Sequence, residues 1–310
     1  MFSPRRIAEI IASNSVLKKL ERRSAHSTYP ASAAIDGALR RGRTLLEFVV
    51  RSIFYICDKP AKLSSLRLLK NSRRGKCALV IANGPSAERL RPNRVGELQS
   101  LGKLEVFVMN GFYKSGLNER IAPDHHVLSD PGHAPDASEF FEGLWLSISK
   151  GVSNVFCPRT WKIDSRVVEP ERVVHFEDRS LELWSKNTSP LRPRGYLSMT
   201  AYKALAIANY MGFKKIYVVG LDNSMFLAFE VDEDNRILQS PNHAGGSGGK
   251  APAHLDGLFP GGVADYFYDL AFGAHQLKKL FGKYPIVNLD RASFTDAFEK
   301  SDELDLLTPN

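Results

Sequence analysis

The stretch CALVIANGPSAERL, residues 77–90, decides the fold. Its first half, residues 77–82, is a continuous apolar run, which is typical of a strand buried in a parallel sheet. The run is then broken by Asn83, Gly84, Pro85 and Ser86. The glycine allows a sharp turn, and the proline suits the first turn of a helix. Because a helix N-terminus attracts anions, the pattern predicts a nucleotide phosphate site; the alternative is an ordinary strand–turn–helix corner.

Apolar runs alternate with helical patterns along the rest of the chain. Further strands are expected at 104–110, 122–130, 153–157, 172–176, 215–222 and 285–289, and helices at 199–211 and 263–281. This alternation predicts an α/β fold, a single doubly wound, mostly parallel Rossmann-like sheet within residues 76–310. A glycine-rich stretch at 242–249 predicts a mobile lid, which we place at about 223–262.

Four of the predicted strands end in a polar residue. These residues are Asn83, Asn110, Asp130 and Asp222. Ligands of such sheets bind beyond the carboxyl ends of the strands, so we expect the four side chains to meet at one edge and to contact substrate.

The charge of the chain is unevenly distributed. The 310 residues carry a net charge of +8, but residues 1–76 alone hold a surplus of twelve positive charges. We therefore treat residues 1–75 as a basic helical extension with amphipathic stretches at 1–24 and 44–57. These stretches either pack on the catalytic body or lie on anionic lipid. Nucleic acid is not an expected partner, because the extension has no interleaved aromatic residues on a recognisable module.

Cysteine content and hydropathy limit the expected cellular location of the protein. Cys57, Cys77 and Cys157 have no metal-ligand spacing and form no even set, so we expect three reduced thiols. No apolar run reaches the length of a membrane span, and the N-terminus has no signal-peptide pattern. The expectation is a cytoplasmic protein, peripheral at the inner face of the cytoplasmic membrane; whether it forms a homo-oligomer is left open.

Three segments together resemble a known family. Residues 81–86, 110–113 and 206–222, in this order and rough spacing, are similar to the bacterial lipooligosaccharide sialyltransferases. The resemblance covers roughly residues 76–290. It implies a glycosyltransferase that moves a sialic acid-like or Kdo-like sugar from a CMP-activated donor to a cell-surface glycan or glycolipid. CMP is already a monophosphate leaving group, so no metal cofactor is obligatory.

The resemblance also implies roles for single residues. Asn83 and Asn110 match asparagines that contact the CMP donor, Thr200 falls where the family has a donor-contacting serine, and Asp130 lies near a donor-binding asparagine. The general base of the family is a histidine in the lid, and the candidates here are His243 and His254.

The sequence departs from the family at one functional point. The family has two tyrosines after the strand that ends in Gly-Ile-Asp, where this chain has Asn-Ser-Met-Phe at 223–226.

A second family shares the scaffold and leaves an alternative. Archaeal-type hydroxymethylpterin diphosphokinases also begin with a strand followed by Gly-Pro-Ser, and residues 123–131 and 220–222 are similar to two of their later segments. In that reading Asp130 and Asp222 would hold Mg²⁺ on ATP, since carboxylate oxygens suit this ion. Asn110 and the residues after it favour sugar transfer, whereas Asp130 favours the kinase.

Overall fold

The computed structural model describes residues 42, 45–46, 49–50, 52–53, 63–135, 148, 151–163, 165–166, 168–178, 188–192, 199–240, 252–259 and 261–301. The predictions for the stretch 1–24, for Cys57, for the glycine-rich stretch 242–249 and for His243 lie outside these residues. Within them, no helix has the length and apolar character needed to cross a membrane.

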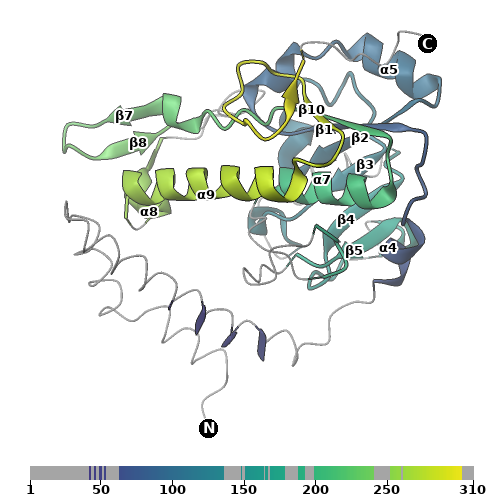
Figure 1. The fold of residues 1–310 in the computed structure, drawn as a ribbon, viewed down its shortest axis with the longest axis horizontal. Coiled ribbons are helices and arrows are strands. Elements are labelled where there is room, and N and C mark those ends of the chain that lie inside the picture. The colour runs from purple at the N-terminus through teal and green to yellow at the C-terminus, as the bar shows by residue number, and fades with distance from the viewer. Residues whose placement is uncertain are drawn as a thin grey trace.

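The main body is an eight-stranded sheet with the order β11-β10-β6-β1-β2-β3-β4-β5, and every neighbouring pair is parallel (Figure 1). The strands are β1 Cys77–Ile81, β2 Leu104–Met109, β3 His125–Val127, β4 Asn154–Pro158, β5 Val173–Phe176, β6 Lys215–Val219, β10 Ile286–Asn288 and β11 Glu299–Lys300. The predicted α/β class is therefore confirmed. The chain adds β2 to β5 on one side of β1 and then returns to add β6, β10 and β11 on the other side.

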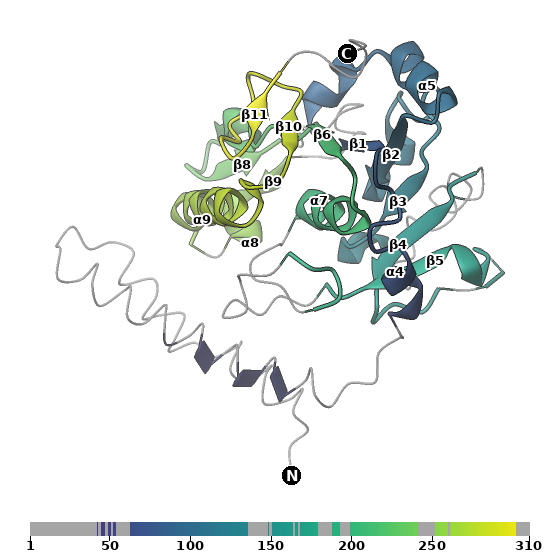
Figure 2. The same cartoon turned by 45° about the vertical axis from the view of Figure 1, so that its right-hand side comes forward.

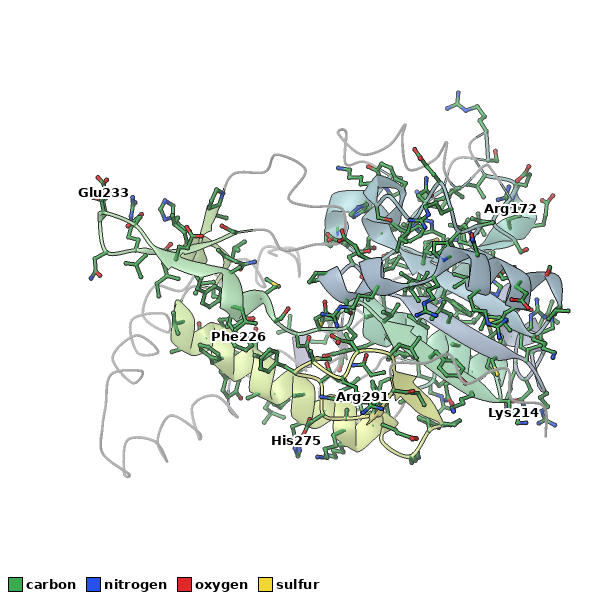
Figure 3. The ribbon with its side chains drawn as sticks, turned by 90° about the horizontal axis from the view of Figure 1, so that it is seen from above. Arg172, Lys214, Phe226, Glu233, His275 and Arg291 are labelled. Atoms are coloured by element: carbon green, nitrogen blue, oxygen red, sulfur yellow. The ribbon has the colours of Figure 1, made fainter. Side chains whose placement is uncertain are left out.

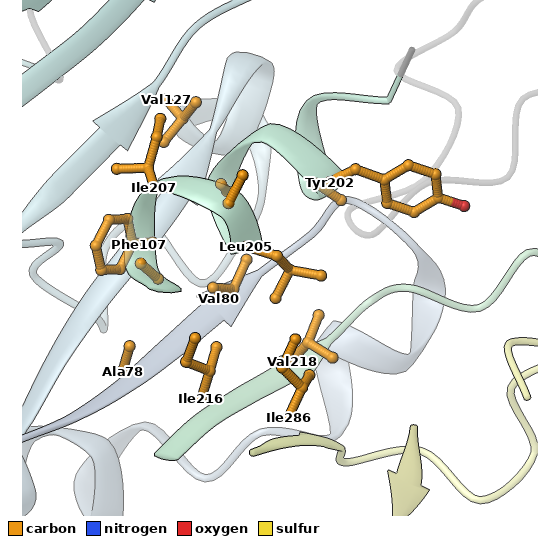
Figure 4. Packing of buried hydrophobic residues seen from close by; sticks show 14 of the residues in the cluster. Ala78, Val80, Phe107, Val127, Tyr202, Leu205, Ile207, Ile216, Val218 and Ile286 are labelled. Atoms are coloured by element: carbon orange, nitrogen blue, oxygen red, sulfur yellow. The ribbon is translucent and has the colours of Figure 1, made fainter. Parts of the chain in front are cut away.

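Helices cover both faces of this sheet. Helices α4 (Ser64–Leu68), α7 (Thr200–Met211) and α9 (Val263–Phe281) lie on one face, and α5 (Pro92–Ser100) lies on the other (Figure 2). Successive side chains of a strand point to opposite faces. In β1, Ala78 and Val80 therefore pack toward α7 (Figure 4), whereas Leu79 and Ile81 pack toward α5. This two-sided burial explains the continuous apolar run of β1.

Helix α7 carries the largest share of the contact with the sheet. It packs on β1, β2, β3 and β6, and ten of its twelve residues are buried. Alanine and leucine favour the helix and let it lie close to the strands. Gly212 ends it in the left-handed conformation with φ +84°, directly after the last residue of the predicted helix 199–211.

A buried ionic cluster fastens the amino ends of the strands. Glu105 on β2 accepts hydrogen bonds from Arg73 at 2.8 Å, Lys76 at 2.8 Å and the His125 ring at 2.8 Å. Burial alone would raise the pKa of Glu105, but the hydrogen bonds from His125, Lys76 and Arg73 outweigh it and lower this pKa to about 2. The cluster lies at the edge of the sheet opposite to the predicted site, so its role is stability.

The predicted lid region is more ordered than its composition suggests. Its described residues form an antiparallel sheet of β7 (Phe229–Val231), β8 (Ile237–Gln239) and β9 (Ala253–His254), next to α8 (Leu255–Leu258). Tyr266 of α9 contacts Phe229 and Phe259, and Phe226 contacts Phe267, so aromatic rings hold this sheet on α9. Figure 3 shows Glu233 at its tip, far from Arg172 of the main body.

Two local differences separate the prediction from the structure. The helix that follows β1 is a 3₁₀ helix of five residues, η1 (Pro85–Arg89), and the α-helix begins only at Pro92. The second proline causes the break, because it keeps Arg91 out of the helical region, with φ −96° and ψ 97°. The sequence also gave no sign of β11, a two-residue edge strand. Short 3₁₀ helices lie at η2 (Asn110–Lys114), η3 (Pro131–His133), η4 (Pro170–Arg172) and η6 (Met225–Ala228).

Candidate active site at the carboxyl edge of the sheet

The strand order places the switch point of the sheet between β1 and β6. From the carboxyl end of β1 the chain leads to β2 on one side, and from the carboxyl end of β6 it leads to β10 on the other side, so the two connections diverge above this edge of the sheet. Doubly wound sheets bind ligands at such a point. The sequence puts Asn83, Gly84, Pro85 and Ser86 at the end of β1 and Asp222 after β6, and the structure brings these two segments together.

Ser86 and Asp222 join the two segments directly. The Ser86 backbone N–H donates to Asp222 Oδ2 at 2.9 Å, and the Ser86 hydroxyl donates to Asp222 Oδ1. The Ser86 hydroxyl also accepts from the Gly220 backbone N–H at 2.9 Å. Both carboxylate oxygens of Asp222 are therefore engaged within the protein. Ser86 thus contacts the end of β6 as well as belonging to the first turn of η1.

Glycines make this contact possible. A Cβ atom on Gly84 would lie 2.5 Å from Asp222 Oδ2 and 2.5 Å from the Gly220 carbonyl oxygen. Gly220 has φ +73°, and a Cβ there would lie 2.3 Å from the Ala82 carbonyl oxygen. The Gly84 N–H donates to the Gly220 carbonyl at 2.9 Å, so the backbones touch where the strands end. Gly84 thus serves a close approach of two chain segments.

A second carboxylate lies beside Asp222. Asp290, which follows β10, hydrogen-bonds Asp222 and receives Arg89 Nη1 at 2.9 Å, and both aspartates are buried. Burial raises the pKa of Asp222, the hydrogen bonds from Ser86 lower it, and the Asp290 carboxylate raises it again. The net result is a pKa above the ordinary value. Asp290 and Arg89 were not among the predicted site residues, because a pair 201 residues apart leaves no local pattern in the sequence.

An uncharged polar group, which we call the Asn110 cluster, joins the ends of β2 and β3 to the start of α7. It consists of Asn110, Ser129 and Thr200. Asn110 Nδ2 donates to Thr200 Oγ1 at 2.9 Å, Asn110 Oδ1 accepts from the Ser129 N–H at 3.2 Å, and the Ser129 and Thr200 hydroxyls are 2.7 Å apart. All three residues are buried. Asn110 has φ +42°, a region that asparagine tolerates better than other residues with a side chain.

Two histidines lie next to the Asn110 cluster. His126 of β3 is fully buried and donates from Nε2 to the Asn110 carbonyl at 2.9 Å. Burial lowers the pKa of His126, the hydrogen bond to the Asn110 carbonyl raises it and the neighbouring His133 lowers it, and the net pKa is about 4. His126 is therefore neutral near pH 7. His133 of η3 lies over Gly111, since a Cβ atom on that glycine would be 3.4 Å from His133 Nε2.

The other predicted site residues have different surroundings. Asn83 is half-buried, and its side chain has no hydrogen-bond partner among the described residues, so it remains available to a ligand. Pro85 begins η1. Asp130 is exposed, accepts from the Gly132 N–H at 3.0 Å, and has Oδ2 4.0 Å from His133 Nδ1. His133 was missed, although it follows a strand end within the short turn Asp-Pro-Gly-His.

His254 lies apart from the strand ends. It belongs to β9 of the small sheet, and its Nδ1 is 3.8 Å from Asp232 Oδ2. Figure 1 shows this sheet at the end of α9 that is remote from β1 and β2. The described part of the structure therefore does not bring His254 together with the Asn110 cluster. Its predicted role as a base stays a prediction, and the same holds for His243.

The structure forms no ready carboxylate site for a metal. Among the described residues, no three of histidine, cysteine, aspartate and glutamate are grouped so that they could hold an ion. Asp130 and Asp222 each have partners of their own. Cys77 and Cys157 are buried free thiols, as predicted, and burial raises the pKa of Cys157 to about 12, so it does not ionise near neutral pH.

Comparisons with known proteins identify no family for this chain. No family model matches the chain, and no curated protein sequence matches it. Among solved structures, the chain is similar to one described as "Structure of MAf glycosyltransferase from Magnetospirillum magneticum AMB-1", with 14% identity and a TM-score of 0.46. The match covers 82% of this chain but only 37% of that one. At this identity and TM-score, the likeness says nothing about the activity of the chain.

Proposed function

We propose that this protein is a glycosyltransferase that takes a sialic acid-like or Kdo-like sugar from a CMP-linked donor. The observation that carries the proposal is the Asn110 cluster, an uncharged hydrogen-bonding group at the first turn of α7 and at the carboxyl ends of β2 and β3. Because its groups are bonded to one another, this cluster holds the strand ends and the start of α7 in place, and the unengaged Asn83 side chain at the end of the neighbouring strand β1 contacts the pyrimidine nucleotide. The three sequence segments that resemble the sialyltransferases point to the same donor.

The start of α7 supplies what the leaving group needs. The helix has twelve residues, no acidic residue in its first turn and no side-chain cap from Met199. The free N–H groups of a helix N-terminus stabilise negative charge, so they suit the phosphate of departing CMP. Asn83 approaches from β1 with an unengaged side chain. The monophosphate leaves without an obligatory metal in this scheme.

Transfer also needs a base for the acceptor hydroxyl. We assign this role to His133, which lies over Gly111 beside the Asn110 cluster. An imidazole nitrogen can accept the proton as the sugar bond forms. His126 has a structural role, because its ring hydrogen-bonds the Asn110 carbonyl and carries no charge at pH 7. In this proposal His133 acts as the base, and His126 takes no part in proton transfer.

The diphosphokinase alternative has one observation in its favour. Asp222 and Asp290 are neighbouring carboxylates at the ends of β6 and β10. Carboxylate oxygens suit Mg²⁺, which would accompany ATP. Both oxygens of Asp222 already accept hydrogen bonds from Ser86, however, and Asp290 is bound to Arg89. Opening this arrangement would cost several hydrogen bonds, so sugar transfer remains the preferred reading.

The acceptor in this proposal is a glycan or glycolipid at the inner face of the cytoplasmic membrane. Leu45, Val49 and Ile53 are helical, spaced four residues apart, and each about half exposed. This spacing puts them on one side of a helix. The sequence surrounds them with Arg41, Arg43 and Arg51 among others, and an apolar stripe with basic neighbours suits an anionic lipid surface.

A thermal-shift panel tests the proposed donor. The protein is heated with CMP, CDP, UDP, ATP or GTP, each with and without Mg²⁺. A ligand that binds only the folded state stabilises it and so raises the melting temperature. At a ligand concentration one hundred times its Kd, the free energy of unfolding rises by about 2.7 kcal/mol. CMP is expected to raise it without metal. A rise with ATP and Mg²⁺ and none with CMP would overturn the proposal in favour of the diphosphokinase.

A further inference from the structure

A cavity of about 530 Å³ lies beside the start of α5, outside the site described above. It is lined by residues 90–94, Glu97 and Arg120, where Arg120 comes from the segment that leads into β3. None of these residues belongs to the Asn110 cluster or to the Ser86–Asp222 contact. The volume is within the range of small-molecule sites.

The lining of this cavity is strongly basic. It contains Arg91, Arg94 and Arg120 against a single acid, Glu97. Arg94 Nη1 pairs with Glu97 Oε2 at 2.5 Å, which neutralises one arginine. The guanidinium groups of Arg91 and Arg120 have no ion-pair or hydrogen-bond partner in the described part of the chain. Two guanidinium groups therefore face a cavity of suitable size with a net charge of +2.

The backbone around the cavity has the same polarity. Arg91 is the N-cap of α5, a helix of nine residues with no acidic residue in its first turn. The N–H groups of Arg94 and Val95 both donate to the Arg91 carbonyl, at 3.0 and 3.2 Å. Asn93 is the second residue of α5, and the N–H groups of a helix's first turn have no partner within the helix, so this N–H adds to the two arginines.

We propose that this cavity binds a phosphate-bearing ligand with two negative charges, a phosphomonoester or a pyrophosphate. Arginine presents a planar fork of donors that matches phosphate oxygens, and such charge-assisted pairs are the strong ones. Two guanidinium groups without partners balance a dianion, whereas a single carboxylate would leave one of them uncompensated. The ligand is therefore a phosphate group.

The position of the cavity suggests which molecule carries the phosphate. Only the five residues of η1 separate it from the turn at Asn83 and Gly84. A 3₁₀ helix rises about 2 Å per residue, so the two places are about 10 Å apart along the chain. Resting on the proposed function, the cavity would hold the phosphate of a phosphorylated acceptor, while the carboxyl edge of the sheet at Asn83 holds the donor.

Binding of pyrophosphate, measured by calorimetry on the full chain, tests the cavity independently of any transferase activity. The pocket variant combines Arg91→Ala with Arg120→Ala. The control variant combines Arg74→Ala with Lys103→Ala, which removes the same charge from exposed positions elsewhere. The pocket variant is expected to bind pyrophosphate at least tenfold more weakly than the wild type, and the control within twofold of it. Equal losses in both variants would overturn the site, because the binding would then reflect net charge alone.

Two further arms complete the experiment. Hydrogen–deuterium exchange on the wild type needs no variant, and pyrophosphate should protect residues 90–97 and the segment around Arg120; unchanged exchange there would contradict the proposal. Flotation with phosphatidic acid vesicles identifies the source of the phosphate: a loss specific to the pocket variant indicates a lipid headgroup, and unchanged flotation together with weakened pyrophosphate binding indicates a non-lipid phosphate. CMP binding is measured in parallel, and its loss would count against the donor assignment and not against the cavity.

Discussion

Replacing Asn110 by alanine should separate the structural from the ligand-binding part of the site. Asn110 and Asn83 both end strands and both match donor-contacting asparagines by resemblance. In the structure, however, Asn110 is buried and holds β2, β3 and α7 together, whereas Asn83 is half-buried and has no partner among the described residues. Asn110→Ala should therefore destabilise the fold, and Asn83→Ala should leave its stability unchanged.

The expected loss follows from the contacts of Asn110. Alanine removes the acceptor of the buried Ser129 N–H, and an unsatisfied buried group costs about 1–3 kcal/mol. The Thr200 hydroxyl keeps Ser129 as a partner, so it adds little. An alanine at φ +42° costs roughly 1 kcal/mol more. The free energy of unfolding should fall by about 3 kcal/mol in total.

Urea unfolding followed by circular dichroism gives this free energy. Asn110→Gly is the informative companion, because glycine accepts the positive φ but also loses the hydrogen bonds. It should be roughly 1 kcal/mol more stable than Asn110→Ala, with Asn83→Ala as the matched control. The reasoning is refuted if Asn110→Ala is as stable as Asn83→Ala, or if the glycine variant is the less stable of the two Asn110 variants.

Three further predictions follow from other parts of the chain. The pKa of Glu105 is lowered from 4.5 to about 2, so its contribution of about 3 kcal/mol to the free energy of unfolding is present above pH 4.5 and lost as the pH falls toward 2. Glu105→Gln should therefore flatten the pH dependence of stability, measured by urea unfolding, between these two values. Glu119→Gln, at an exposed position, should not change it. If His133 is the base, His133→Ala lowers the rate of CMP release from the sugar donor about a hundredfold without changing CMP affinity, and a larger effect of His254→Ala would reverse the assignment. The full chain should float with anionic vesicles at low salt and less at high salt, whereas a chain that begins at Ser72 should not; absence of flotation by the full chain would mean that residues 1–75 do not bind membrane.

The sequence predicted most of the sheet and its main helices because their signals are local. The apolar runs of β1 and β2 and the helical periodicity of α7 and α9 each lie within one segment, and Gly212 marks the end of α7. The short helix η1 was not predicted, because it depends on a second proline seven residues after the first. The small sheet escaped prediction because its strands have only two or three residues and depend on aromatic contacts with α9.

The polar strand ends were predicted, but the bonds between them were not. The strand ends gave Asn83, Asn110 and Asp222, since a polar residue after an apolar run is visible in the sequence. The bond between Ser86 and Asp222 spans 136 residues, and no local pattern reports such a pairing. For the same reason the sequence did not show that the Asn110 side chain would donate a hydrogen bond to Thr200, 90 residues away.

Calorimetric titration of CMP tests the central claim most directly. The wild-type protein should bind CMP in a saturable manner without metal. Asn83→Ala should weaken this binding roughly tenfold, which corresponds to the loss of one hydrogen bond to the ligand. Asn235→Gly, in the exposed turn between β7 and β8, serves as the control and should bind like the wild type. No binding of CMP by the wild type, or equal affinity in Asn83→Ala, would contradict the assignment of the carboxyl edge of the sheet to a CMP-linked donor.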